Sequence, residues 1–255
     1  MPGWIRPGGP EARRKGFVRV DRASGPRPVP TVMHMTATCD ATKVETQRGF
    51  AVPHFAAALA GEPCTVHGLE ARPHRLPMAR WNAVPDASDE AVLSFCDGPV
   101  LDIGCGPGRM SGHLAARGIG VLGIDIVPEA VALTRARGVS ALQRDVFERL
   151  PGEGAWVCAL LADGNIGIGG DPVQLLRRVA VLLAPGGWVV ADLAAPGTPL
   201  ETRSVRLECA GLHSDPFPWS VLGPEAIGDV ALAAGLRVDG LHEYDDRWFV
   251  VLVKD

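Results

Sequence analysis

A short apolar run that ends in three closely spaced glycines constrains this chain most. Residues 100–109 read VLDIGCGPGR, and a helix-compatible segment, 110–117, follows at once. A strand, a glycine turn and a helix in this order let the backbone approach a ligand closely and point free N–H groups at it. The dinucleotide fingerprint G-x-G-x-x-G would need glycine at position 109, where this chain has arginine. The spacing therefore favours a nucleoside-type ligand without a pyrophosphate over a nicotinamide or flavin cofactor.

From residue 87 onward, apolar strands alternate with amphipathic helices. This alternation predicts a Rossmann-like α/β fold, in which a mainly parallel sheet carries helices on both faces. A further helix and a hairpin that turns at residues 244–246 complete the C-terminal part. The predicted helices cover 88–96, 109–117, 129–137, 171–183 and 223–234, and the predicted strands cover 99–103, 120–125, 141–145, 155–161, 187–193, 236–243 and 247–253.

Three segments depart from this alternation. Residues 1–50 are rich in Pro, Gly and Arg, a composition that predicts a disordered extension. Residues 51–86, with a helix at 55–60, are expected to form a cap or lid. Residues 196–222 form an insertion on the substrate side of the main domain, 87–255, and 203–209 within them are typical of an extra strand.

Composition limits the class of protein and its partners. The 255 residues are 47% hydrophobic with a net charge of −4 and no basic face, so nucleic acid is not an expected partner. The longest apolar run, 179–195, is broken by Pro-Gly-Gly, which argues against a membrane span. The six cysteines form no C-x-x-C pair, and we interpret them as reduced, buried thiols of a soluble cytoplasmic protein.

Acidic residues follow the predicted strands, where open parallel sheets bind their ligands. Asp125 ends the second strand of the main domain and is placed to accept hydrogen bonds from two ribose hydroxyls, although a helix cap is the alternative. Asp145 follows the third strand and is placed to accept from the exocyclic amine of adenine while the Val146 N–H donates to a ring nitrogen; a solvated loop carboxylate is the alternative. After the fourth strand, Asp163 and Asn165 are the polar groups nearest the reacting centre, unless they serve only the turn.

Together these residues resemble the class I S-adenosylmethionine-dependent methyltransferases, over roughly residues 87–255. Residues 102–108 resemble the glycine motif of that family, and 183–188 resemble the start of its fifth strand. The resemblance implies a seven-stranded sheet with an antiparallel last strand, S-adenosylmethionine as cofactor and S-adenosylhomocysteine as product. Residues 163–172 also look like an actinobacterial-type subgroup, which names no acceptor. The implied cofactor-binding residues are Asp102, Gly104, Cys105, Gly106, Gly108, Asp125, Ile126, Asp145, Val146, Ala162 and Asp163.

The motifs of individual subgroups of this family narrow the range of possible methyl acceptors. The fourth strand lacks the Asn/Asp-Pro-Pro-aromatic motif of nucleic-acid amino-methyltransferases, and no Pro-Cys nucleophile is present there. Asp163 and Asp192 match two acids of the metal-dependent catechol-type enzymes, but Leu193 replaces the following Asn, so no metal is expected. We therefore expect a small-molecule acceptor, methylated on O, N or C.

The catalytic base is less well specified. Asp163, His213 and His74 are candidates that spacing does not separate, and His67 and His74 do not have the spacing of a metal-ligand pair. Trp81, Asn165, Phe217 and Trp219 are the predicted substrate-binding residues, with simple lid packing as the alternative for the aromatic ones. A non-catalytic S-adenosylmethionine-binding protein is the alternative function, and a nicotinamide-dependent oxidoreductase is less favoured.

Overall fold

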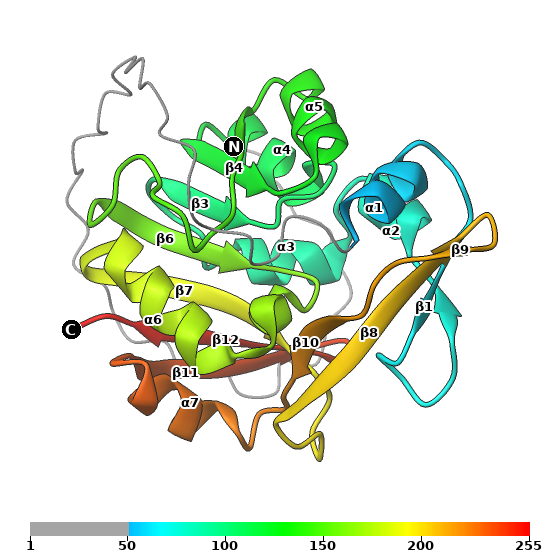
Figure 1. The fold of residues 1–255 in the computed structure, drawn as a ribbon. Coiled ribbons are helices and arrows are strands. Elements are labelled where there is room, and N and C mark those ends of the chain that lie inside the picture. Colours follow the sequence, from blue (N-terminus) through cyan, green and yellow to red (C-terminus); the bar gives the residue numbers. More distant parts are fainter. Residues whose placement is uncertain (1–50) are drawn as a thin grey trace, which may run out of the picture.

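A seven-stranded sheet forms the centre of the computed structural model, which describes residues 51–255 (Figure 1). The extension predicted over residues 1–50 lies outside the described residues. The strands lie in the order β5 (Ser140–Gln143), β4 (Val121–Asp125), β3 (Val100–Ile103), β6 (Trp156–Leu161), β7 (Leu183–Leu193), β12 (Arg247–Val253) and β11 (Arg237–Tyr244).

The direction of these strands confirms the predicted fold class. The first five pair in parallel, whereas β12 runs antiparallel to both β7 and β11. From β3 the chain moves to β4 and β5 on one side and then crosses to β6 on the other. Strand order therefore reverses next to β3, the place where open α/β sheets bind ligands.

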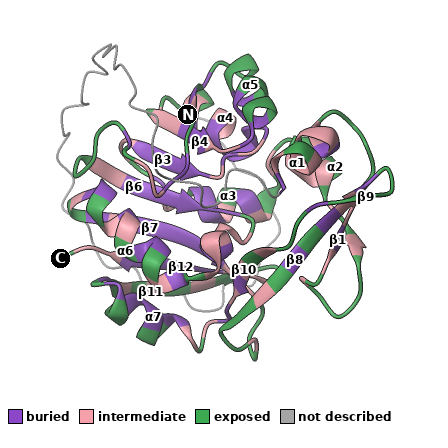
Figure 2. Ribbon diagram, viewed as in Figure 1, coloured by how far each residue is buried: buried purple, intermediate pink, exposed green. Residues whose placement is uncertain are grey.

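Helices cover both faces of this sheet because successive strand side chains point in opposite directions. Apolar residues of α3 (Ala87–Leu93) and α4 (Arg109–Ala116) pack with Val100 and Leu160 on one face. Those of α6 (Pro172–Leu182) and α7 (Ile227–Ala233) pack with Leu101 and Leu161 on the other. Figure 2 shows the strands between these layers as the most buried part of the molecule.

Helix starts follow local sequence signals. Asp86 and Asp89 form a reciprocal capping box at the start of α3. The Asp171 side chain accepts a hydrogen bond from Gln174 N at the start of α6, and α5 (Pro128–Ala136) begins with proline at its first position. No helix of the described residues is long and apolar enough to cross a membrane.

A second, antiparallel sheet, here called the cap sheet, joins segments that are far apart in the sequence (Figure 1). It has the order β10-β8-β1-β2, with β9 paired to β8, and the short helices α1 (Val52–Leu59) and α2 (Met78–Asn82) accompany it. Its strands are β1 (Cys64–His67), β2 (His74–Arg75), β8 (Glu201–Cys209), β9 (Leu212–His213) and β10 (Phe217–Val221).

Most predicted elements are present within a few residues of their predicted bounds. The largest differences are that β7 begins at Leu183 rather than 187 and that α7 begins at Ile227 rather than 223. The early start of β7 includes Pro185-Gly-Gly, where the pairing with β6 shifts register between Trp156 and Cys158. An irregular stretch of this kind has no periodicity that the sequence pattern would reveal.

The interpretation of all cysteines as reduced thiols is wrong for one pair, because Cys64 and Cys209 form a disulfide. They are directly opposed in the antiparallel pair β1–β8, with Cα atoms 4.4 Å apart. Cys96, Cys105 and Cys158 are buried and form no disulfide, as expected, and Cys39 lies outside the described residues. The pair was missed because only the sheet topology brings residues 145 positions apart together.

Candidate functional site

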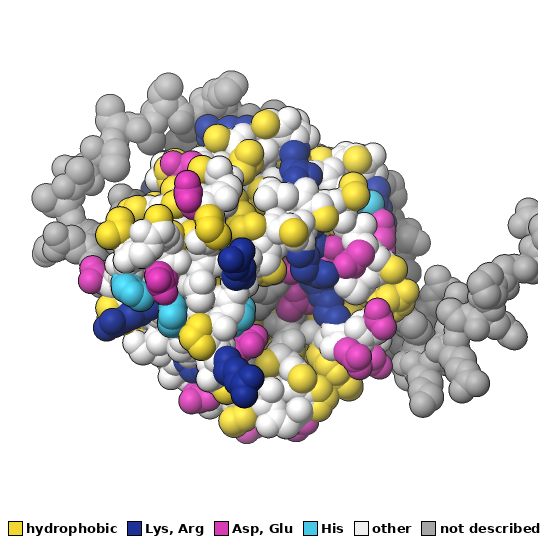
Figure 3. Space-filling model, turned by 90° about the vertical axis from the view of Figure 1, so that its right-hand side faces the viewer, with side chains coloured by type: hydrophobic (Ala, Val, Ile, Leu, Met, Phe, Trp, Pro, Cys, Tyr) yellow, Lys and Arg dark blue, Asp and Glu magenta, His cyan; other side chains and the backbone are white. Residues whose placement is uncertain are grey.

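A cavity of about 730 Å³ lies between the carboxyl ends of the central strands and the inner face of the cap sheet. Figure 3 shows a hollow on this side of the molecule. The lining that comes from the main sheet and its loops consists largely of polar side chains and glycine backbone, whereas the lining that comes from the cap sheet is almost entirely apolar. The cavity therefore has two chemically different halves, which we call the polar half and the apolar half.

The glycine turn after β3 forms the floor of the polar half. Gly104, Gly106 and Gly108 have φ of 69°, 53° and 80°, a region that residues with a side chain rarely adopt. Gly106 lines the cavity, and a Cβ built on it would meet no atom within 4 Å. Gly108 caps α4 beneath the turn, packed against Thr134, and does not itself line the cavity.

Asp125, at the end of β4, holds the turn in place. Its Oδ2 accepts from Gly106 N and its Oδ1 from Val127 N, both at 2.9 Å. The N-cap residue of α5 is Val127, so Asp125 does not fill the helix-cap role that was its alternative. Burial raises the pKa of the Asp125 carboxyl above its usual range, an effect that the hydrogen bonds partly offset. The carboxylate lines the cavity beside Ile126, where each oxygen keeps lone pairs for a ligand.

Two more acids contribute to the polar half. Asp145 is only 7% exposed and accepts from Phe147 N at 2.9 Å, and it lines the cavity together with Val146. Asp102, on β3, accepts a 2.5 Å hydrogen bond from the Ser111 hydroxyl, and desolvation raises the pKa of its carboxyl to about 6. Cys105 and Ala162 also line the cavity, and burial raises the pKa of the Cys105 thiol above its usual range.

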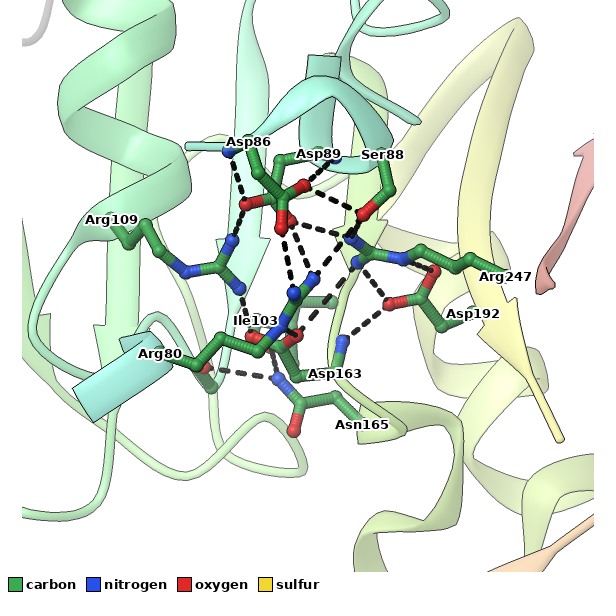
Figure 4. Close-up of polar contacts among 11 residues, drawn as sticks. Arg80, Asp86, Ser88, Asp89, Ile103, Arg109, Asp163, Asn165, Asp192 and Arg247 are labelled. Carbon is green, nitrogen blue, oxygen red and sulfur yellow. Dashed lines mark hydrogen bonds and ion pairs between the residues drawn. The ribbon is translucent and has the colours of Figure 1, made fainter. Parts of the chain in front are cut away.

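Seven charged residues form a connected group at the edge of the polar half, which we call the ion-pair cluster (Figure 4). Asp89, 1% exposed, contacts Arg109 on one side and Arg247 Nη1 at 2.5 Å on the other. Burial alone would raise the pKa of the Asp89 carboxyl, but the hydrogen bonds from Arg109 and Arg247 outweigh burial and lower this pKa below its usual value. Arg247 also forms a bidentate pair with Asp192, at 2.9 and 2.5 Å. The members are Arg80, Asp86, Asp89, Arg109, Asp163, Asp192 and Arg247.

Asp163 belongs to this cluster, which bears on its candidacy as a base. Its Oδ2 accepts from Arg109 Nη2 at 2.6 Å, and its Oδ1 lies 3.9 Å from Arg80 Nε and 3.8 Å from Arg247 Nη2. Its own N–H donates to Asp192 Oδ2 at 2.6 Å, with a left-handed φ of 53°. Asp163 lines the cavity, but three guanidinium groups surround its carboxylate, an arrangement suited to positioning rather than to proton abstraction.

Asn165 ties the loop after β6 to the glycine turn. Its Nδ2 donates to Ile103 O at 2.8 Å and to Gly104 O at 3.0 Å (Figure 4). A Cβ on Gly104 would lie 2.7 Å from this amide, so the contact requires glycine there. Asn165 lines the cavity as predicted for a substrate-binding residue, while its amide nitrogen is already bonded to the protein.

The cap sheet supplies the apolar half. Trp81 on α2 and both Phe217 and Trp219 on β10 line it, and the last two rings pack edge to face with centroids 6.5 Å apart. Figure 1 shows the strands that carry this wall at the side of the main sheet. The remaining apolar lining comes from Ala51, Phe55, Leu59, Val66, Leu69, Leu76, Pro77, Ile168, Val205, Leu207 and Pro218.

The two histidine candidates lie in different places. His74, on β2, lines the cavity; its buried Nδ1 makes no hydrogen bond, and Glu70 Oε2 lies 3.6 Å from it. His213, on β9, is exposed and is not among the residues that line the cavity. Of the two, only His74 is placed to meet a ligand in the apolar half.

Sequence reasoning missed the arginines Arg80, Arg109 and Arg247 and most of the apolar lining. Their positions depend on contacts between distant segments, as when Arg247, after the C-terminal hairpin turn, meets Asp89 of α3. One local signal was available. In β8, residues Val205, Leu207 and Cys209 alternate with polar ones, a pattern that indicates one buried face.

Comparison with known proteins agrees with this geometry. A family model described as a methyltransferase domain matches residues 100–187. A ubiquinone biosynthesis O-methyltransferase of Xanthomonas oryzae pv. oryzae is 33% identical over 202 residues, which cover 74% of this chain and 71% of that protein. The chain belongs to the S-adenosylmethionine-dependent methyltransferase family.

Two further curated relatives of this methyltransferase family member align with shorter parts of it. The chain spans about half (54%) of a trans-aconitate 2-methyltransferase of Paracidovorax citrulli, at 31% identity over 58% of its own length. It spans 27% of a tabtoxin biosynthesis enzyme of Pseudomonas amygdali pv. tabaci, at 46% identity over 27% of its own length. The fold is similar to that of a SAM-dependent methyltransferase from Bacteroides fragilis solved with S-adenosyl-L-homocysteine. The TM-score is 0.69 at 19% sequence identity, and the match covers 82% of this chain and 96% of that one.

We expect Arg247→Met to lower the free energy of unfolding by about 3–5 kcal/mol, because it removes the bidentate partner of the buried Asp192 carboxylate and one of the guanidinium groups that pair with buried Asp89. Arg237→Met is the matched control, since Arg237 lies on the neighbouring strand β11 with its side chain 56% exposed. The free energy of unfolding of Arg237→Met is expected to stay within about 0.5 kcal/mol of the wild type. Urea unfolding measures both variants, and equal effects would contradict the importance of the cluster.

Proposed function

We propose that this protein transfers the methyl group of S-adenosylmethionine to a small molecule and releases S-adenosylhomocysteine. The observation that carries the proposal is that a glycine turn and the carboxylates of Asp125 and Asp145 share one cavity with an apolar pocket. Membership of the family supports the cofactor, and the two halves of the cavity give each reactant a separate place. The similarity of residues 163–172 to an actinobacterial-type subgroup is part of this proposal and does not specify the acceptor.

The polar half is the proposed cofactor site. The turn at 104–108 would surround the methionine portion, where Gly106 leaves open space beside the backbone. Asp125 would accept from the ribose hydroxyls, and Asp145 with the Val146 N–H would bind the adenine edge. Asp102, near the end of β3, is buried and hydrogen-bonded to Ser111 and lines the cavity beside the turn. The sulfonium would then face the apolar half.

The apolar half is the proposed acceptor site. Its aromatic rings and aliphatic side chains favour a neutral or weakly polar molecule with a ring, since such groups desolvate apolar surface and stack on flat ligands. A phosphate-rich polymer would need a basic surface. The described basic side chains of this half are His74 and, at its edge, Arg80, which is paired with Asp86 and Asp89.

His74 is the proposed base, which points to a hydroxyl acceptor. It is the candidate that lines the apolar half without being held in an ion pair with arginine. Its imidazole would take the hydroxyl proton as the oxygen forms a bond to the methyl carbon and the bond between that carbon and sulfur breaks. Glu70, 3.6 Å from Nδ1, would stabilise the imidazolium. Otherwise the reaction depends on in-line positioning, for which rigid aromatic walls are suited.

Two measurements test the function. Calorimetry with S-adenosylmethionine, S-adenosylhomocysteine and NAD should show binding of the first two and tighter binding than for NAD. Incubation with methyl-labelled S-adenosylmethionine and a metabolite extract rich in phenols should yield labelled small molecules. Preference for NAD, or cofactor binding with no labelled product across broad extracts, would contradict the proposal.

Asp125→Ala is expected to weaken S-adenosylhomocysteine binding by about 1.5–3 kcal/mol, the usual value of hydrogen bonds to a charged group. Asp171→Ala is the matched control, because Asp171 caps α6 and does not line the cavity. Calorimetry should therefore show unchanged affinity for that variant. If Asp125→Ala binds as tightly as the wild type, the carboxylate only supports the turn.

We expect Trp81→Ala and Trp219→Ala to lower turnover by about tenfold or more, since both remove part of the wall that positions the acceptor. Their affinity for S-adenosylhomocysteine should stay within a few-fold of the wild type. Trp156→Ala, at the opposite end of β6 and outside the lining, is the control for loss of an aromatic ring. A parallel loss of cofactor binding in the first two variants would place these side chains at the cofactor instead.

A further inference from the structure

Three side chains that suit a metal ion project from the outer face of the cap sheet, away from the cavity. His67 lies on β1, Glu208 on β8 and His213 on β9. In β8 the inward positions Val205 and Leu207 are buried against the cavity, so Glu208 points outward. The face shown in Figure 3 carries histidine side chains next to acidic ones.

Strand register places the three on the same face. Glu208 is the direct cross-strand partner of His213. On the other side of β8, Glu208 faces Thr65, and His67 lies two residues further along β1 on the same face. Residues from three strands therefore converge although His67 and Glu208 are 141 positions apart in the sequence.

The distances fit a shared ion. His67 Nε2 lies 2.9 Å from Glu208 Oε2, and the rings of His67 and His213 have centroids 5.7 Å apart. One ligand atom from each residue lies within 4.8 Å of the other two. Ligands about 2.0–2.2 Å from a tetrahedral zinc ion are roughly 3.4 Å from one another. The separations in this cluster lie on both sides of that distance, so only small adjustments are needed for all three residues to share one ion.

The backbone beneath the cluster is held in register from two directions. The Cys64–Cys209 disulfide joins β1 to β8 next to the cluster. The two-residue turn Ala210–Gly211, with φ of 51° and 78°, joins β8 to β9 as a tight hairpin. Ligands on a fixed backbone lose little conformational freedom when an ion binds, which favours binding.

We propose that His67, Glu208 and His213 bind a divalent transition-metal ion such as zinc. Two imidazoles and one carboxylate are ligands that zinc prefers, whereas Mg²⁺ and Ca²⁺ prefer oxygen ligands alone. The side chains of His67 and Glu208 are 34% and 37% exposed, so water completes the coordination. The ion displaces the proton shared by these two residues and cross-links three strands of the cap sheet.

The site is separate from the proposed reaction. None of its three residues lines the cavity, and it acts on the sheet that forms the cavity wall. Arg206 is the nearest basic neighbour by register, as the cross-strand partner of His67 on the same face. It is exposed and offers no ligand atom, which makes it the matched control.

The test is calorimetric titration of the full oxidised chain with zinc chloride, repeated with magnesium chloride. We expect one zinc ion per chain, with affinity reduced about tenfold or more in His67→Ala, Glu208→Ala and His213→Ala and not reduced in Arg206→Ala. His213→Ala changes an exposed side chain on a two-residue strand, so this variant is expected to fold. Thermal unfolding of each variant without metal verifies this.

Amide hydrogen exchange gives a second readout that does not depend on activity. Zinc should slow exchange in β8 and β9 of the wild type and of Arg206→Ala, and should not do so in His213→Ala. Zinc binding that persists unchanged in all three ligand variants would place the ion elsewhere and overturn the proposal. Absence of zinc binding to the wild type would overturn it as well.

Discussion

The buried carboxylate of Asp89 is the interaction on which the site geometry depends most. It lies between the guanidinium groups of Arg109 and Arg247 and so joins α3, α4 and β12 at one point. A buried charge is costly unless it is paired, so these elements are stabilised only in the arrangement that satisfies all three groups. Arg109 and Arg247 extend the same requirement to Asp163 and Asp192, at the ends of β6 and β7. The strand ends that border the cavity are thereby fixed relative to one another.

The fold was predictable wherever the determinants are local. Alternating strands and helices gave the main sheet, and the glycines at 104, 106 and 108 marked the turn at its centre. Asp125 and Asp145 were identifiable because a residue at the carboxyl end of a parallel strand must lie at the ligand edge.

What the sequence pattern did not reveal depends on contacts between distant segments. Asp163 was a candidate base because it follows a strand, yet its environment is set by Arg109, 54 positions away. Cys64 and Cys209 were assigned as thiols because nothing local shows that β1 and β8 are neighbours. His213 was a candidate base on residue type alone, and the topology of the cap sheet places it on the outer face instead. In each case the residue type was informative and the partner was not visible.

Strand β8 serves two surfaces at once, because Val205 and Leu207 face the cavity while Arg206 and Glu208 face outward. Insertion of a single residue into this strand would exchange the two sets and turn a charged row toward the pocket. Length changes in the cap are therefore better tolerated in the loops between its strands than within β8. Evolution of acceptor choice in a protein built this way would proceed by replacing alternate side chains, leaving strand length untouched.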